Sequence, residues 1–338
     1  MFRSLPPRRS SAALRSAALG ESLRTVRVAL AANLLVAAAK LAAGLLSGSA
    51  ALLAEAGHSL ADSVNEVFLG ISLRRGNLPA DPIHPLGHGR ERFLWAFMAA
   101  IASFLIGGCL SIGLAIRELL AGGVPGDLRL AGVVLAVAFV ADGTSLLQSL
   151  RQARHEARAR GEPLPRYVLH TSDPALRAVV VEDSAGVVGV VAATAGLLAS
   201  MLLGRDTPDA LASLAIGLLL AATAFGLARP LADYLIGRSL PADQLQRLYA
   251  ILVAAPAVEE VILLQAVYTG PDEIVVAAKV RPVPSQTVDA LAHAMDDLDR
   301  ALRAALPEVA EVYIDVTTYR AEIAQHGAPP LSPRRGRA

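Results

Sequence analysis

Residues 50–73, AALLAEAGHSLADSVNEVFLGISL, are apolar enough for a membrane helix and yet carry acids and a histidine. On a helix, the spacing of Glu55, His58, Asp62 and Asn65 places all four on one stripe. His58 and Asp62 are one turn apart and can point at the same object. An ionisable group inside a bilayer costs about 2.5 to 3.5 kcal/mol even on lenient scales. A bound cation or proton would offset that cost, so this stretch predicts a cation site inside a membrane domain.

The composition agrees with a membrane protein. The chain has 338 residues, of which 54% are hydrophobic and 18% charged, whereas soluble domains are about one quarter charged. The net charge of +1 gives no reason to expect nucleic acid as a partner. The single cysteine, Cys109, excludes a disulfide framework and a thiolate metal site.

Six apolar segments are long enough to cross about 30 Å of hydrocarbon. The long loops, 74–93 and 151–174, are rich in arginine and the short turns are not, which predicts that both termini are cytoplasmic, in the cell membrane. Residues 1–25 are predicted to be a basic cytoplasmic tail; a transit peptide to an organelle is the alternative. The transmembrane domain, residues 26–239, contains the segments 26–46, 50–73, 94–119, 129–150, 175–203 and 209–229.

Residues 240–322 are predicted to form a small soluble α+β domain. The pattern gives the order helix, strand, strand, helix, strand. The predicted helices are 241–256 and 285–307, and the predicted strands are 258–270, 273–283 and 311–319. Residues 323–338 have the composition of a disordered tail.

The fifth apolar segment carries two adjacent acids, Glu182 and Asp183. Adjacent helical residues lie about 100° apart, so both cannot face one point equally well. A row of small residues follows that would let another helix approach closely, at Ala185, Gly189 and Ala193. Asp142 in the fourth segment is predicted to be a further buried acid.

Two motifs carry a family resemblance. HSLADSVNE at 58–66 and HPLGHGRERF at 84–93, followed by an acid in the fifth helix, resemble the cation diffusion facilitators. VEDSAGVVGV at 181–190 and VADGTSLLQSL at 140–150 further resemble the zinc transporter 9-like branch. The resemblance implies a homodimeric exporter of divalent transition metals, with an all-α six-helix transmembrane domain and a ferredoxin-like cytoplasmic C-terminal domain.

The resemblance also implies metal ligands. His58 and Asp62 match the pair on the second helix, and Asp183 matches the acid on the fifth, but Val179 stands where the family has a histidine. Glu182, Asp142 or a water molecule are the alternatives for the fourth ligand. Nitrogen and oxygen ligands suit zinc, and a carboxylate in place of histidine would admit Mn²⁺, Co²⁺ or Fe²⁺.

The remaining polar residues are assigned supporting roles. Glu55 and Asn65 are predicted to support the ligands or to line the access path. Lys40 is interpreted as a packing and snorkelling residue. His84 and His88 are interpreted as parts of a structured turn, with metal delivery as the alternative.

Within the predicted soluble domain, Asp315 stands where the family often has a metal-binding histidine, and the single histidine is His293. We therefore expect this domain to serve mainly for dimerisation.

The functional hypothesis is proton-coupled efflux of divalent metal, zinc first, by alternating access, with no cofactor and no enzymatic reaction. One alternative is a metal-sensing or scaffold membrane dimer that does not transport, for which the missing histidine is the motive. A membrane-embedded metal hydrolase is disfavoured, because the sequence has no HExxH motif and no nucleophile elbow.

Overall fold

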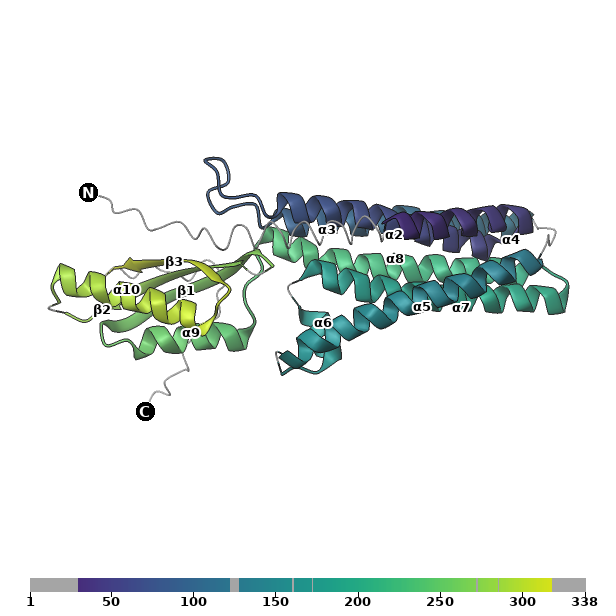
Figure 1. The fold of residues 1–338 in the computed structure, drawn as a ribbon. Coiled ribbons are helices and arrows are strands. Elements are labelled where there is room, and N and C mark those ends of the chain that lie inside the picture. Colours follow the sequence, from purple (N-terminus) through teal and green to yellow (C-terminus); the bar gives the residue numbers. More distant parts are fainter. Residues whose placement is uncertain are drawn as a thin grey trace. The chain divides into compact units, whose positions relative to one another are not determined.

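The computed structural model describes residues 30–121, 128–159, 161–171, 173–271, 273–284 and 286–317. The chain divides into a helical unit that ends at Ala232 and a mixed unit that begins at Asp233. Figure 1 shows the elements of both units. The predicted tails, 1–25 and 323–338, lie outside the described residues.

Long helices make up the first unit. A helix over Leu30–Ser47 is followed by α2 (Ala50–Arg75), and α3 (Glu91–Ala102) continues through a π-helical segment, η1 (Ser103–Cys109), into α4 (Leu110–Ala121). Then come α5 (Leu128–Ala159), the short α6 (Leu164–His170), α7 (Pro174–Leu203) and α8 (Thr207–Ile236).

Five helices are long and apolar enough to cross a membrane, among the described residues. They are Leu30–Ser47, Glu91–Ala121, Arg129–Ala159, Pro174–Leu203 and Thr207–Ile236. The protein is therefore a multi-pass membrane protein. The predicted span at 50–73 is the helix α2, which is 26 residues long but is not in this set, because its polar stripe lowers its mean hydropathy.

A buried acid fixes the start of α2. The Asp209 carboxylate, in the first turn of α8, accepts hydrogen bonds from Ser49 Oγ (2.8 Å) and from the backbone N–H of Ala51 (3.0 Å). Ser49 Oγ in turn accepts from the N–H of Leu52 (3.1 Å). These bonds satisfy donors that a helix N-terminus leaves open, so α8 holds the beginning of α2 in place.

The predicted small-residue row on α7 lies in the core of the helical unit. Ala185, Gly189 and Ala193 are all buried. A Cβ on Gly189 would lie 2.1 Å from Glu55 Oε1, so the α2 carboxylate occupies the space that a side chain would take. The prediction of a close approach to α7 is confirmed.

The predicted loop 151–174 is in large part helical, and this corrects the sequence interpretation. Residues 151–159, RQARHEARA, are mostly good helix formers, so α5 continues past the apolar segment to Ala159. Tyr167 on α6 donates a hydrogen bond from its hydroxyl to Glu156 Oε2 (2.7 Å), which ties α6 to this extension.

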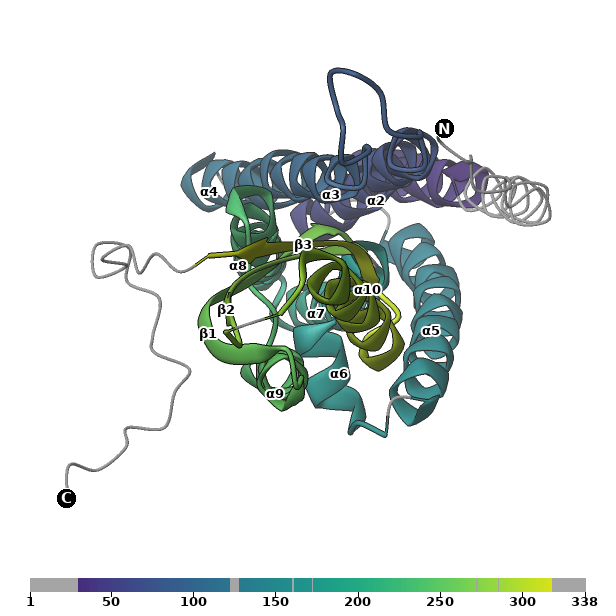
Figure 2. The ribbon, with the colours of Figure 1, turned by 90° about the vertical axis from the view of Figure 1, so that its left-hand side faces the viewer.

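The second unit confirms the predicted order of elements: α9 (Ala242–Ala254), β1 (Val258–Gly270), β2 (Glu273–Pro282), α10 (Val288–Ala305) and β3 (Val309–Val316). The strands form one sheet in the order β1-β2-β3, with β1 antiparallel and β3 parallel to β2. Figure 2 shows α9 and α10 on one side of this sheet. Alternate β2 side chains are accordingly buried, at Ile274, Val276, Ala278 and Val280.

Candidate metal centre

The predicted pair on α2 is close in space. His58 Nε2 lies 3.7 Å from Asp62 Oδ2, and the His58 side chain is buried while that of Asp62 is 28% exposed. The one-turn spacing on a helix accounts for this arrangement.

A glycine on α7 opens the space in front of His58. A Cβ on Gly186 would lie 3.0 Å from His58 Nε2 and 3.8 Å from Asp142 Oδ2. Side chains of α2 and α5 thus meet at one position on α7. Asp142 is not fully buried, contrary to the prediction: its side chain is 22% exposed, because α5 is the least buried of the five apolar helices.

The two adjacent acids of α7 face different helices, as the 100° rotation predicts. Asp183 Oδ1 accepts a hydrogen bond from Ser145 Oγ on α5 (2.9 Å). Glu182 accepts from Ser103 Oγ at the start of η1 (3.2 Å) and from the Asn65 amide on α2. Asp183 therefore lies toward Asp142, whereas both Glu182 oxygens already have donors.

A buried lysine joins the centre, and the snorkelling interpretation of Lys40 is wrong. Lys40 Nζ lies 3.0 Å from Glu55 Oε2 and 3.3 Å from Asp142 Oδ2, and its side chain has no solvent exposure. Two carboxylates inside the helical unit hold the ammonium, so it has no need to reach the membrane surface. Glu55, predicted to support the ligands, thus forms an ion pair with a buried lysine.

The candidate ligands of the helical unit do not converge on one point. Among the described residues, one group of three or more His, Cys, Asp or Glu has ligand atoms that all lie within 4.8 Å of one another, and it lies in the 76–90 loop: Asp81, His84 and His88. The candidates His58, Asp62, Asp142 and Asp183 do not meet that distance in this conformation. Side-chain movements would have to bring them onto one ion.

The loop group is both a structured turn and a set of potential ligands. Asp81 Oδ1 accepts from the backbone N–H groups of Ile83 (2.8 Å) and His84 (2.6 Å), as the turn interpretation predicts. His88 Nε2 lies 3.2 Å from Asp81 Oδ2, and its Nδ1 lies 3.0 Å from Glu91 Oε1. These hydrogen bonds raise the pKa of His88, and the backbone N–H of His84 is the main cause that lowers the pKa of Asp81 to about 2.

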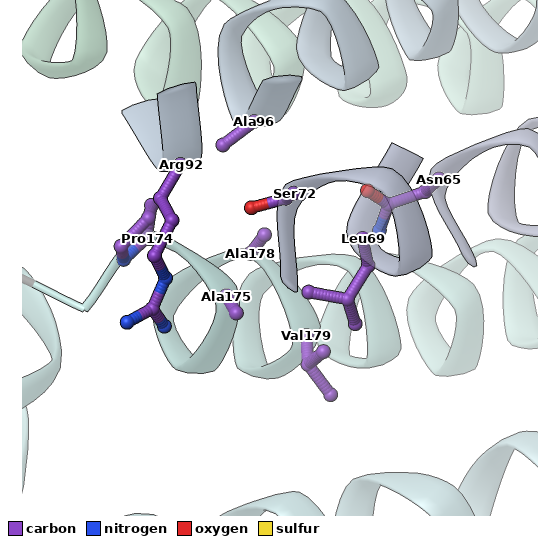
Figure 3. A pocket seen from close by; sticks show the side chains of 9 residues that line it. All are labelled: Asn65, Leu69, Ser72, Arg92, Ala96, Pro174, Ala175, Ala178 and Val179. Atoms are coloured by element: carbon purple, nitrogen blue, oxygen red, sulfur yellow. The ribbon is translucent and has the colours of Figure 1, made fainter. Parts of the chain in front are cut away.

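The position of the missing histidine lines a small pocket. Figure 3 shows Val179 and Asn65 at this pocket, with Arg92 on its other side. Its volume of about 20 Å³ is room for about one water molecule. Arg92 Nη2 lies 3.8 Å from Asp173 Oδ1, so a weak ion pair borders the pocket.

The sequence of this chain matches the model of one protein family. The family model of the cation efflux transmembrane domain matches residues 26–236, which is more than half of the sequence. The chain belongs to the cation efflux family. The match covers every candidate ligand named above.

Three relatives of this family member are informative. A mitochondrial proton-coupled zinc antiporter, SLC30A9, of Xenopus laevis is 34% identical over 71% of this chain and 43% of its own length. Its Mus musculus counterpart is 30% identical over 76% of this chain and 45% of its own length. Metal tolerance protein C4 of Arabidopsis thaliana is 31% identical over 68% of this chain and 50% of its own length. The chain spans about half the length of the curated relatives it matches.

Sequence reasoning missed three participants in the family member's centre. Lys40, Ser103 and Ser145 all bond to acids that lie far away in the sequence. A lysine in the middle of an apolar helix was the one available signal, since such a residue needs a partner inside the membrane.

Proposed function

We propose that this chain carries divalent transition-metal cations, zinc first, out of the cytoplasm in exchange for protons. The observation that carries this proposal is that His58, which lies beside Asp62, and Asp142 both border the space at Gly186. Asp183, which accepts a hydrogen bond from Ser145 on the same helix as Asp142, completes the proposed ligand set in this cation efflux protein. One imidazole and three carboxylates form a nitrogen and oxygen ligand set that suits zinc and admits Mn²⁺, Co²⁺ or Fe²⁺.

In this proposal Asp142 takes the place of the absent histidine. It borders the same glycine as His58, whereas the Glu182 oxygens accept bonds from Asn65 and Ser103. Glu182 is then a neighbour of the path, next to the pocket that Val179 lines.

The proposed mechanism is competition between metal and protons for the same groups. His58 and the carboxylates must be deprotonated to bind the ion, and protons that arrive from the far side displace it. No covalent bond changes, so the proposed activity is transport and not an enzymatic reaction. Alternating access exposes the site to each side in turn.

The membrane arrangement is part of the proposal. The α2 helix has 26 residues and a length of about 39 Å, which is enough for a sixth span. Arginine-rich loops favour cytoplasmic termini in the cell membrane, with the second unit as a ferredoxin-like dimerisation domain, residues 240–322. The names of the two antiporter relatives place those proteins in mitochondria, which supports the organelle alternative.

A metal-sensing or scaffold dimer is the second candidate. Val179 in place of histidine and ligands that do not converge favour it. It predicts metal affinity without flux.

Zinc flux in proteoliposomes with an imposed pH gradient tests the proposal. We expect Asp62→Ala and Asp142→Asn to reduce the flux at least about tenfold, since loss of a residue that only supports a ligand already costs about 10- to 100-fold. Glu182→Gln is the matched control in the same unit, and we expect it to retain most of the flux. Wild-type protein that binds zinc but moves none supports the scaffold, and a loss in Glu182→Gln without a loss in Asp142→Asn reassigns the fourth ligand.

A further inference from the structure

The buried ammonium of Lys40 has no role in the transport scheme above. It lies between two carboxylates that come from α2 and α5, 15 and 102 residues away in the sequence. Neither Lys40 nor Glu55 has any solvent exposure. A cation inside the helical unit, in contact with a candidate metal ligand, must affect how a second cation binds there.

The two carboxylates that hold Lys40 are not equivalent. Glu55 is fully buried and lies 3.0 Å from the ammonium, whereas Asp142 is 22% exposed and lies 3.3 Å away. Asp142 also borders Gly186 together with His58 Nε2. Glu55 is thus placed as a fixed partner, and Asp142 as a partner that can be shared with an incoming ion.

Glu55 has capacity for a second hydrogen bond from the lysine. Its Oε1 atom is buried and has no hydrogen-bond partner within the described part of the chain. This atom lies where a Cβ on Gly189 would be, 2.1 Å from that position. An ammonium has three donors, so a Lys40 that left Asp142 could bond to both oxygens of Glu55.

We propose that Lys40 is a tethered cation that occupies Asp142 when no metal is bound and withdraws to Glu55 when metal binds. This inference rests on the proposed metal centre at Asp142. Lys40 is a positioning residue in this scheme, since it acts through the carboxylate and does not touch the ion. It lowers the affinity for metal, which aids release, and keeps Asp142 paired while the centre is empty.

A static ion pair that merely holds helices together is the competing explanation, and two substitutions separate the two. Glu55→Gln removes the fixed partner and leaves the ammonium on Asp142 alone, so the tethered cation should compete more strongly and zinc affinity should fall. Lys40→Met with Glu55→Gln removes one positive and one negative charge and frees Asp142, so zinc affinity should rise. A pair that only holds the helices together and does not compete for Asp142 would leave the zinc affinity unchanged or lower it in both variants.

The experiment is calorimetric titration of zinc into the full-length protein in lipid nanodiscs. All variants carry His84→Ala and His88→Ala, because the loop group would otherwise bind zinc as well. The charge-matched double substitution avoids the unpaired buried carboxylate of Lys40→Met alone, and gel filtration checks that each variant is folded. In an Asp142→Asn background, Lys40→Met with Glu55→Gln should no longer raise the affinity, since Asp142 is the proposed link.

We expect the dissociation constant for zinc to rise about tenfold in Glu55→Gln and to fall about tenfold in the double variant. Changes of this size are typical of residues that contact a metal ligand without touching the metal. Weakening in both, no change in either, or no zinc binding by any variant overturns the tethered cation. Zinc flux is measured on the same variants in proteoliposomes. Opposite affinity changes without flux would contradict the transport proposal alone, and flux without these changes would contradict the tethered cation alone.

Discussion

Two glycines on α7 determine where charged groups fit. Gly189 leaves room for the Glu55 carboxylate, and Gly186 leaves room in front of His58 and Asp142. Both positions are helical, where glycine costs about 1 kcal/mol relative to alanine. The space that each glycine provides is therefore its main contribution to this protein.

Substitution of Gly186 tests that contribution. Gly186→Ala should weaken zinc binding by about tenfold or more, because the new methyl group would lie 3.0 Å from His58 Nε2 and displace the imidazole. Its thermal stability should stay near that of the wild type, since the His58 ring can shift and alanine is the better helix former.

The matched control is Gly132→Ala on α5, where a Cβ would meet nothing within 4 Å. Calorimetry in the protein without loop histidines measures both. Equal zinc affinity in Gly186→Ala and Gly132→Ala would show that the metal does not bind beside Gly186.

The sequence predicted the part of the centre that is local. His58 and Asp62 are one turn apart, and their proximity follows from helix geometry. The roles of Asp142 and Lys40 do not follow from the sequence. Their partners come from other helices, and residue spacing along one helix does not show how helices pack together. The opposite directions of Glu182 and Asp183 followed from the 100° rotation, but the hydroxyl donors that each finds did not.

At the scale of elements, the hydrogen bonds from Ser49 and Ala51 to Asp209, here called the Asp209 clamp, stabilise the start of α2. Asp209→Ala should lower the free energy of unfolding by about 2 kcal/mol, since it leaves Ser49 Oγ and the Ala51 N–H without their buried acceptor. Thermal melting in detergent measures the loss. Asp209→Asn keeps one acceptor oxygen and should lose less; equal stability of the alanine variant and the wild type would contradict the clamp.

The stability of the loop between α2 and α3 should depend on pH. The raised pKa of His88 means that its protonated form stabilises the folded loop fully below about 6.5 and that this contribution is lost as pH rises through the raised value. The lowered pKa of Asp81 means a contribution that is present above about 3.9 and lost as pH falls toward 2. The metal-free loop is therefore most stable between these limits.

Hydrogen exchange of residues 81–91 in the presence of a chelator measures this. After correction for intrinsic rates, protection should be greater at pH 6 than at pH 8, and His88→Asn should remove the difference. The same difference in His88→Asn and in the wild type would assign the pH dependence to another group.

Element types were predictable and irregularities were not. The strands and helices of the second unit follow period-2 and period-3.6 patterns, which the sequence shows directly. The π-helical segment η1 interrupts a uniformly apolar stretch, and Gly107 and Gly108 there face Leu220 and Ala221 of α8. That irregularity depends on the neighbouring helix, so periodicity alone carries no sign of it.

For the whole molecule, the proposed homodimer needs a surface, and the sheet offers one. The face of the sheet away from α9 and α10 carries half-buried apolar side chains at Val267, Val275 and Ala277, with Tyr313 54% exposed beside them. Ala277→Arg should convert a dimer into a monomer, because it places a charge at the centre of this face.

Light scattering after gel filtration of the full-length protein measures the mass. Ala304→Arg on the exposed side of α10 is the matched control and should leave a dimer intact. A dimer that persists in Ala277→Arg would place the contact elsewhere.

Because Asp209 holds the N-terminal end of α2, the helix would rock about that end in the proposed transport cycle. A rod held at one end swings like a lever, and displacement grows with distance from the fulcrum. His58 lies about 13 Å along the helix from Ser49, and Asn65 about 24 Å. A rocking of α2 about the clamp therefore shifts the contact between Asn65 and Glu182 nearly twice as far as it shifts the imidazole. In the proposed transport cycle, such a rocking would therefore open the far end of α2, where Asp62 and Asn65 lie, further than the space around His58.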